Sequence, residues 1–123
     1  MYLLDTNILI DFLKGDEKIV NWVIKQREET PLYISTISKL EILSLKFLTE
    51  KQIKEIKSFL ETFHLLWLNN DIIEISALLR RKTGLNVADS IIGATAINFK
   101  FTLITRDKIF QRKIKPFLKV SEI

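Results

Sequence analysis

The chain has 123 residues, of which 47% are hydrophobic and 28% are charged, a composition typical of one globular domain and not of a disordered chain. No apolar run reaches the roughly 18 residues that span a bilayer, and no basic segment precedes an apolar one at the N-terminus, so we expect a cytoplasmic protein without membrane contact. There is no cysteine, and the single histidine, His64, lies in an apolar run that reads as a strand. Disulfides, thiolate metal sites and cysteine nucleophiles are therefore excluded, which leaves carboxylates and hydroxyls as the available chemistry.

The net charge is +4, from 19 basic and 15 acidic residues. If four of the acids gather in one site, 11 acids face 19 bases elsewhere, and the rest of the molecule carries a charge of +8. A basic body around an acidic pocket favours a polyanionic substrate held near a metal ion. The alternative is an ordinary protein with lysine-rich, solvated faces.

Apolar runs separated by breaks predict strands that alternate with helices in a single domain over residues 1–123. Strands are expected at residues 2–4, 32–35, 64–68, 101–104 and 117–120. Helices are expected at residues 8–13, 18–29, 38–48, 50–62, from a cap at 69–71 to 82 or 83, at 88–98 and at 108–112. The alternation predicts an α/β fold with a mainly parallel sheet that helices cover on both faces.

Four acids are candidates for one site at the edge of this sheet. Asp5 follows the first strand, Asp107 lies three residues past the fourth, and Glu41 falls in the first turn of the helix after the second. Residues just past parallel strands share an edge of the sheet, and ligands bind there. Asp89 opens a buried helix that precedes a strand, so we expect it at the opposite edge unless the link before Ala88 crosses the top of the sheet.

The chemistry of such a cluster points to a divalent cation. Neighbouring carboxylates repel one another by roughly 3 kcal/mol per pair at an effective dielectric constant of about 20, and protonation or a bound cation relieves that repulsion. Ligands that offer only oxygen select Mg²⁺ or Mn²⁺ over zinc. The hydroxyls of Thr6 and Thr105 either support this site or cap helices. Candidates for binding the phosphates of a polyanionic substrate are the bases nearest the acids, Lys39, Arg106 and Lys108.

Each acid also has a purely structural alternative. Ser38 and Glu41 have the spacing of a capping box, in which the glutamate bonds back to the backbone of the serine. Asp89 and Asp107 can be ordinary helix N-caps, and Asp5 can start a turn. Spacing alone leaves these alternatives open.

Four segments resemble the PIN-domain family, and within it the VapC toxins of prokaryotic toxin–antitoxin pairs. They are Leu-Leu-Asp-Thr-Asn-Ile-Leu-Ile-Asp at 3–11, Ile-Ser-Thr-Ile-Ser-Lys-Leu-Glu-Ile-Leu at 34–43, Ala-Asp-Ser-Ile-Ile-Gly-Ala-Thr-Ala at 88–96 and Leu-Ile-Thr-Arg-Asp-Lys-Ile-Phe at 103–110. The resemblance covers essentially the whole chain. One departure is Asn86-Val87-Ala88, where many members carry a proline.

The resemblance implies a PIN-like three-layer α/β/α fold and metal-dependent endonucleolytic cleavage of RNA by a metal-activated water. Its acidic ligands, which are also its catalytic residues, fall on Asp5, Glu41, Asp89 and Asp107, and Thr105 falls where the family often carries Thr or Ser. The implied cofactor is Mg²⁺ or Mn²⁺. The implied partners are an RNA substrate, a VapB-like antitoxin and a second copy in a homodimer.

Other functions remain open beside the toxin ribonuclease. A PIN nuclease of RNA processing without an antitoxin shares the same motifs. A catalytically silent PIN scaffold is disfavoured because all four acids are present. A phosphoacceptor receiver domain is disfavoured because the third strand leads into Asn69 and not into an aspartate. The apolar residues Leu43, Leu45, Phe47 and Leu48 exceed what one helix face can bury, so we expect some of them to meet a second copy or an antitoxin helix.

Overall fold

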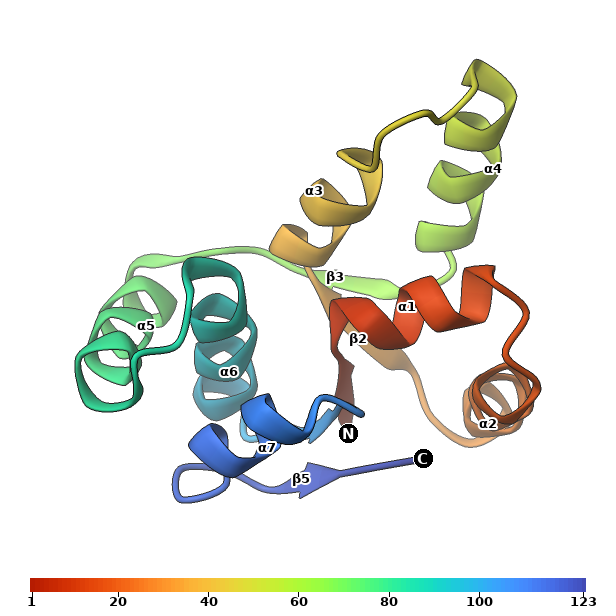
Figure 1. Cartoon of the computed structure of the whole chain (residues 1–123). Helices are drawn as coiled ribbons and strands as arrows, with labels where there is room; N and C mark the ends of the chain where they lie inside the picture. Colours follow the sequence, from red (N-terminus) through yellow and green to blue (C-terminus); the bar gives the residue numbers. More distant parts are fainter.

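A computed structural model describes all residues, 1–123 (Figure 1). Its five-stranded sheet has the order β3-β2-β1-β4-β5, and every neighbouring pair is parallel. The strands are β1 Tyr2–Leu4, β2 Leu32–Ser35, β3 His64–Leu66, β4 Thr102–Ile104 and β5 Val120–Ser121. The helices are α1 Thr6–Leu13, α2 Glu17–Glu29, α3 Thr36–Leu43, α4 Glu50–Leu60, α5 Asn70–Thr83, α6 Val87–Phe99 and α7 Lys108–Ile114. No helix has both the length and the apolar character of a membrane span.

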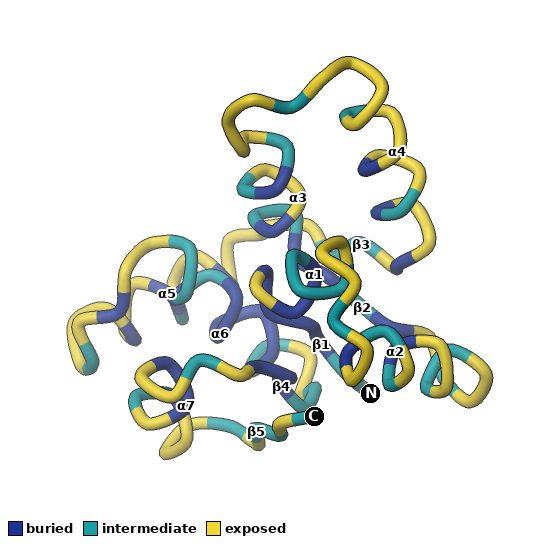
Figure 2. Tube along the Cα trace, turned by 45° about the vertical axis from the view of Figure 1, so that its right-hand side comes forward, coloured by how far each residue is buried: buried dark blue, intermediate teal, exposed yellow.

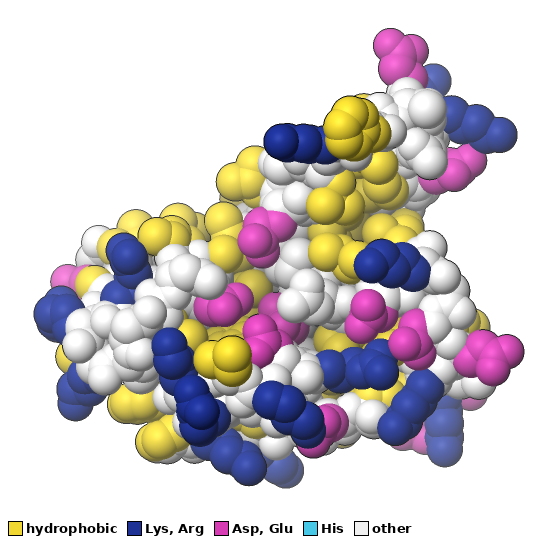
Figure 3. All heavy atoms as spheres, viewed as in Figure 1, with side chains coloured by type: hydrophobic (Ala, Val, Ile, Leu, Met, Phe, Trp, Pro, Cys, Tyr) yellow, Lys and Arg dark blue, Asp and Glu magenta, His cyan; other side chains and the backbone are white.

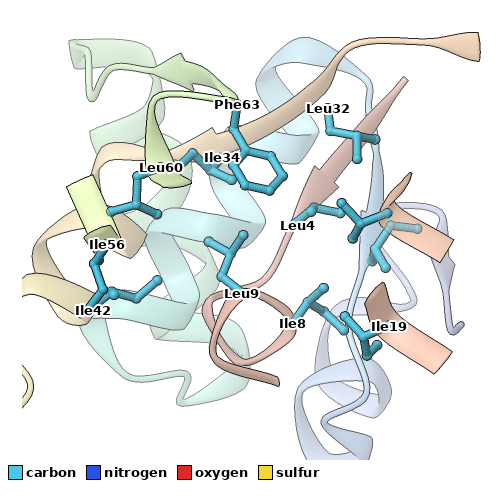
Figure 4. Packing of buried hydrophobic residues seen from close by; sticks show 12 residues of the cluster. Leu4, Ile8, Leu9, Ile19, Leu32, Ile34, Ile42, Ile56, Leu60 and Phe63 are labelled. Atoms are coloured by element: carbon cyan, nitrogen blue, oxygen red, sulfur yellow. The ribbon is translucent and has the colours of Figure 1, made fainter. Parts of the chain in front are cut away.

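Two hydrophobic cores cover the two faces of the sheet, as successive strand residues point to opposite sides. Leu4 faces the core formed with α1, α2, α3 and α4, whereas its neighbour Leu3 faces the core formed with α5, α6 and α7. Figure 4 shows the first core, in which Leu9 of α1 lies between the sheet residue Leu4 and Leu60 of α4. Buried backbone is concentrated in the central strands and the inward faces of the helices (Figure 2). The predicted three-layer α/β/α architecture with a parallel sheet is confirmed.

Several predicted boundaries are wrong, and for three of them the error has a clear local cause. The helix expected to reach residue 48 ends at Leu43, and the chain then bends through Phe47, which has a left-handed φ of 67°, to reach the cap of α4. β3 ends at Leu66 and not at residue 68, because its partner β2 ends at Ser35 opposite Leu66. β5 starts at Val120 and not at residue 117, because the chain first turns after α7 with a bond from the Phe117 N–H to the Ile114 carbonyl.

The direction of α6 decides where its first turn lies. α6 ends shortly before the amino end of β4, so it runs antiparallel to the strands and begins at their carboxyl edge (Figure 1). α5 packs along α6, and only residues 84–86 join them, with Gly84 at a left-handed φ of 72°. The expectation that the start of this helix lies at the opposite edge is therefore wrong, because a helix that feeds a parallel strand starts at the edge where that strand ends.

Candidate active site

Four acidic residues come together at the carboxyl edge of the sheet. Asp5 directly follows β1, and its N–H donates to the Ile104 carbonyl at 3.0 Å, so the pairing of β1 with β4 continues up to the acid. Asp107 follows β4, while Glu41 and Asp89 come from α3 and α6. Figure 3 shows acidic side chains gathered in the middle of this face, beneath the arm formed by α3 and α4, with lysine and arginine side chains along the lower margin.

Asp5 is the buried member of the cluster, with only 3% of its surface exposed. It occupies the N-cap position of α1, yet its side chain makes no capping bond, and its Oδ2 accepts the Thr105 hydroxyl at 2.8 Å. The pKa of Asp5 is raised from 3.8 to about 6, chiefly by burial; the Thr105 hydrogen bond opposes the rise, and the charges of Asp89 and Asp107 add to it. An aspartate that only starts a turn would not be desolvated in this way. The alternative that Asp5 merely starts a turn therefore does not explain its burial.

Glu41 points to Thr6 and not back to its own helix. α3 begins at Thr36, so Glu41 lies in the second turn and not in the first as expected. The N-cap is Ser35, whose hydroxyl accepts the Ile37 N–H at 3.1 Å, and the predicted alternative of a capping box formed by residue 38 is therefore wrong. The Thr6 hydroxyl donates to Glu41 Oε1 at 2.8 Å, and this bond joins α1 to α3 across 35 residues of sequence.

Asp89 is the third residue of α6, and Asn86 is the N-cap. The Asn86 Oδ1 accepts the Asp89 N–H at 2.8 Å, and its Nδ2 lies 3.3 Å from Asp89 Oδ2. Asp89 is therefore not the cap itself. Burial raises its pKa, the negative charges of Asp107 and Glu41 raise it further, and the positive charge of Lys113 on α7 partly opposes them.

Asp107 has a structural role and also faces the cluster. Its Oδ1 accepts the N–H groups of Ile109 and Phe110 at 3.0 and 3.1 Å, so the alternative that it caps a helix is confirmed. Its Oδ2 has no hydrogen-bond partner in the protein, and its charge raises the pKa of both Asp5 and Asp89. The cap fixes one oxygen and leaves the other available to a ligand.

The bases proposed to bind phosphate have different surroundings. Arg106 donates to Asp16 Oδ2 at 2.9 Å and to Asp11 Oδ2 at 3.4 Å, and it lowers the pKa of Asp16 through that hydrogen bond. Lys108 pairs with Glu122 at 2.6 Å, whereas Lys39 is exposed and forms no ion pair. Solvent screens exposed ion pairs and makes them weak, so a polyanion can displace them.

The donor set fits a hard divalent cation. All candidate ligands are carboxylate oxygens, which Mg²⁺ and Mn²⁺ prefer, and the negative charges of neighbouring acids contribute to the raised pKa of Asp5 and of Asp89. No three of these side chains lie close enough in this structure to hold one ion together. The cluster is therefore an open arrangement, and at least some of its side chains must move closer to coordinate a common ion.

Sequence reasoning missed three contributors to this site. Ser38 was considered only as a cap, yet its hydroxyl lies 2.8 Å from the Thr6 hydroxyl. Asn86 was noted only as a departure from a motif, and Lys113 was not singled out. Of these, only Ser38 carried a signal, since it lies one helical turn before Glu41; the effect of Lys113 on Asp89 depends on the tertiary packing of α7. As predicted, His64 is a strand residue; it is exposed, and its ring lies beside that of Tyr33.

Comparison with known proteins gives consistent results. The family model for the PIN domain matches residues 2–115. A toxin–antitoxin complex from Klebsiella pneumoniae contains a chain 30% identical to this one, with 100% of each chain covered and a TM-score of 0.80. FitAcB from Neisseria gonorrhoeae is 25% identical, with 98% of this chain and 96% of that chain covered and a TM-score of 0.77.

VapBC2 from Rickettsia felis, bound to a DNA fragment from its promoter, shares the fold. It has a TM-score of 0.85 at 22% identity, with 99% of this chain and 98% of that chain covered. The chain has no match among curated protein sequences.

Proposed function

Because the chain belongs to the PIN domain family and is of the VapC type, we propose that it is a metal-dependent endoribonuclease that acts as the toxin of a toxin–antitoxin pair in the cytoplasm. The observation that carries this proposal is the convergence of four carboxylates on one sheet edge, where burial and the neighbouring charges raise the pKa of Asp5 to about 6. Repulsion between these carboxylates destabilises the metal-free fold. A bound cation would relieve it, which supports a metal site at this edge.

In this proposal, Asp5, Glu41, Asp89 and Asp107 hold Mg²⁺ or Mn²⁺. When bound, the ion supplies Lewis-acid stabilisation of charge on the scissile phosphate and lowers the pKa of a water molecule. Thr105 and Thr6 donate their hydroxyl protons to Asp5 Oδ2 and Glu41 Oε1, and these bonds restrict the rotation of the two carboxylates. Asp89 or Glu41, each with a charge facing the cluster, orients the attacking water and accepts its proton.

Phosphate binding falls to the basic residues nearest the acids. Lys39 is free to bind an RNA phosphate, and Arg106 and Lys108 exchange their carboxylate partners for phosphates when RNA arrives. Neutralised phosphates release counterions, so affinity for RNA should fall steeply with salt. An RNA with an accessible backbone is the substrate class that this surface fits.

An antitoxin segment is the proposed occupant of an apolar groove beside the arm. The groove has a volume of about 300 Å³ and is lined by Ile10, Leu13, Leu45, Leu48 and Ile56, among others. Leu45 and Phe47 are 43% and 98% exposed, which agrees with the expectation that the apolar residues of this stretch exceed what the chain buries. The support for an antitoxin is that the similar chain from K. pneumoniae comes from a toxin–antitoxin complex.

A homodimer remains part of the proposal and uses a different surface. Three large apolar side chains near α5 and the start of α6 are well exposed: Trp67 at 72%, Ile73 at 51% and Val87 at 51%. Exposed apolar residues that are grouped in one region indicate an interaction surface. Light scattering of the purified chain should report two copies. A monomer at micromolar concentration would remove the dimer from the proposal without affecting the nuclease.

The metal requirement tests the proposed activity. The purified chain should cut end-labelled single-stranded RNA in Mg²⁺ or Mn²⁺, and EDTA in excess should abolish the cleavage. A single-stranded DNA of the same sequence shows whether the substrate class is RNA. Full cleavage in EDTA would overturn the metal mechanism, and cleavage that no co-purified antitoxin suppresses would favour a nuclease of RNA processing.

A further inference from the structure

Glu41 is the only one of the four acids held by a chain of two hydroxyl groups. Thr6 Oγ1 lies 2.8 Å from Glu41 Oε1 and 2.8 Å from Ser38 Oγ. Ser38 is completely buried and Thr6 is 6% exposed, so water does not compete for either hydroxyl. The three side chains therefore form one connected polar group at the junction of α1 and α3.

The direction of these bonds follows from proton counting. An ionised carboxylate can only accept, so the single hydroxyl proton of Thr6 is directed to Glu41. The other bond of Thr6 then needs a proton from elsewhere, and only Ser38 can donate it. Since the Ser38 hydroxyl has no other hydrogen-bond partner, the relay runs in one direction, from Ser38 through Thr6 to Glu41.

The neighbouring acid is held by the same arrangement with a different first donor. Thr105 donates to Asp5 Oδ2 at 2.8 Å and itself accepts the backbone N–H of Asp107 at 3.1 Å. In both cases a threonine hydroxyl donates to the acid and is oriented by a second donor. For Asp5 that second donor is a backbone N–H, which no substitution of Asp107 other than proline removes. For Glu41 it is the side chain of Ser38, which a substitution can remove.

We propose that Ser38 is a positioning residue that acts through the Thr6 hydroxyl to hold Glu41 in the orientation required for metal binding. This inference rests on the proposed function, because Glu41 is a metal ligand only within it. A rotamer of Glu41 fixed before the ion arrives loses less conformational freedom on binding. Without Ser38, the Thr6 hydroxyl can rotate away, and Glu41 must be ordered by the ion itself.

The protein contains a matched control for this relay. Ser76 Oγ lies 2.7 Å from Ser90 Oγ, and Ser90 donates its own proton to the Val87 carbonyl at 2.7 Å. Ser76 is therefore also the first donor of a buried hydroxyl pair, with the difference that its pair ends on a carbonyl and not on an acid. Ser76→Ala removes the same atom and the same kind of bond as Ser38→Ala.

The test measures Mn²⁺ binding to the whole chain by isothermal titration calorimetry, and unfolding by denaturant in EDTA. We expect Ser38→Ala to weaken Mn²⁺ binding about threefold to tenfold, the effect of one net hydrogen bond, while Ser76→Ala leaves it unchanged. In EDTA the two variants should unfold at similar denaturant concentrations. On RNA, kcat of Ser38→Ala should fall by a similar factor with KM unchanged, since phosphate contacts remain intact.

A double-mutant cycle separates the relay from a general loosening of α3. In a Thr6→Val background the relay is already broken, so adding Ser38→Ala should cause no further loss of Mn²⁺ affinity. Parental affinity in Ser38→Ala, an equal loss in Ser76→Ala, or full additivity with Thr6→Val would each overturn the relay and leave the proposed function standing. A parent chain that binds no Mn²⁺ would overturn both.

Discussion

Neutralising Asp5 should stabilise the metal-free protein while abolishing its activity. Asp5 is buried, and its pKa is raised from 3.8 to about 6 in the fold. Each pH unit between these values corresponds to about 1.4 kcal/mol, so the ionised side chain destabilises the folded state by about 3 kcal/mol. Asn has the shape of Asp and keeps an oxygen to accept the Thr105 hydroxyl, so Asp5→Asn should recover about 1–3 kcal/mol at pH 7.5.

The pH dependence gives this prediction its sign. An acid whose pKa is higher in the folded chain binds its proton more tightly there, so stability falls as the pH rises from 3.8 to about 6 and stays low above that. Urea denaturation in EDTA should show that fall in the parent, and Asp5→Asn should lack it. The two proteins should then be similar at pH 4 and differ most at pH 7.5.

Asp16 provides the control for the same assay. Its pKa is lowered by the hydrogen bond from Arg106, so neutralising it by Asp16→Asn should give no gain at pH 7.5. If Asp5→Asn showed the parental pH profile, or were destabilised equally at pH 4 and pH 7.5, the reasoning about buried repulsion at this edge would be refuted.

Two further predictions test the fold that supports the site. Thr49→Ala removes a complete capping box with Gln52 at the start of α4. It should lower the free energy of unfolding by about 1 kcal/mol in denaturant titrations without changing RNA cleavage. An unchanged denaturation midpoint would contradict the stabilising role of this cap. Gly93→Ala places a Cβ 2.8 Å from Ile114 Cδ1, so it should lower the free energy of unfolding by about 1–3 kcal/mol. The loss should be smaller in an Ile114→Val background, which lacks this methyl group. Equal losses in both backgrounds would show that the close contact is not the cause.

The strands and most helices were predictable because each is marked by local chemistry. Asn69 caps α5 through its Oδ1, and Gly84 ends the same helix in a left-handed conformation, as the sequence indicated. The end of α3 was not predictable, because residues 44–48 continue an apolar pattern while the chain turns towards the cap at Thr49. The apolar residues there line the groove, as Leu45 and Leu48 do, or are exposed, as Phe47 is, and they do not form one face of a helix.

The candidate site was predictable as a list of acids but not as a set of contacts. Strand ends and the family motifs selected Asp5, Glu41, Asp89 and Asp107, and the topology brings them to one edge. The hydroxyl partners depend on the approach of α1 to α3, which no local pattern reports. For that reason Ser38 was interpreted as a helix cap, while in the fold it donates to Thr6.

The cleavage rate of Glu41→Gln on RNA tests the central claim most directly. Gln has the size of Glu and can still accept the Thr6 hydroxyl, but a neutral amide is a poor ligand for a hard divalent cation. Single-turnover cleavage in Mn²⁺ should therefore fall by about 100-fold or more, while the metal-free fold is unchanged or gains up to about 3 kcal/mol. Glu74→Gln on the exposed face of α5 should cleave at the parental rate. A Glu41→Gln protein that cleaves RNA as fast as the parent would contradict the assignment of this carboxylate cluster as the catalytic metal site.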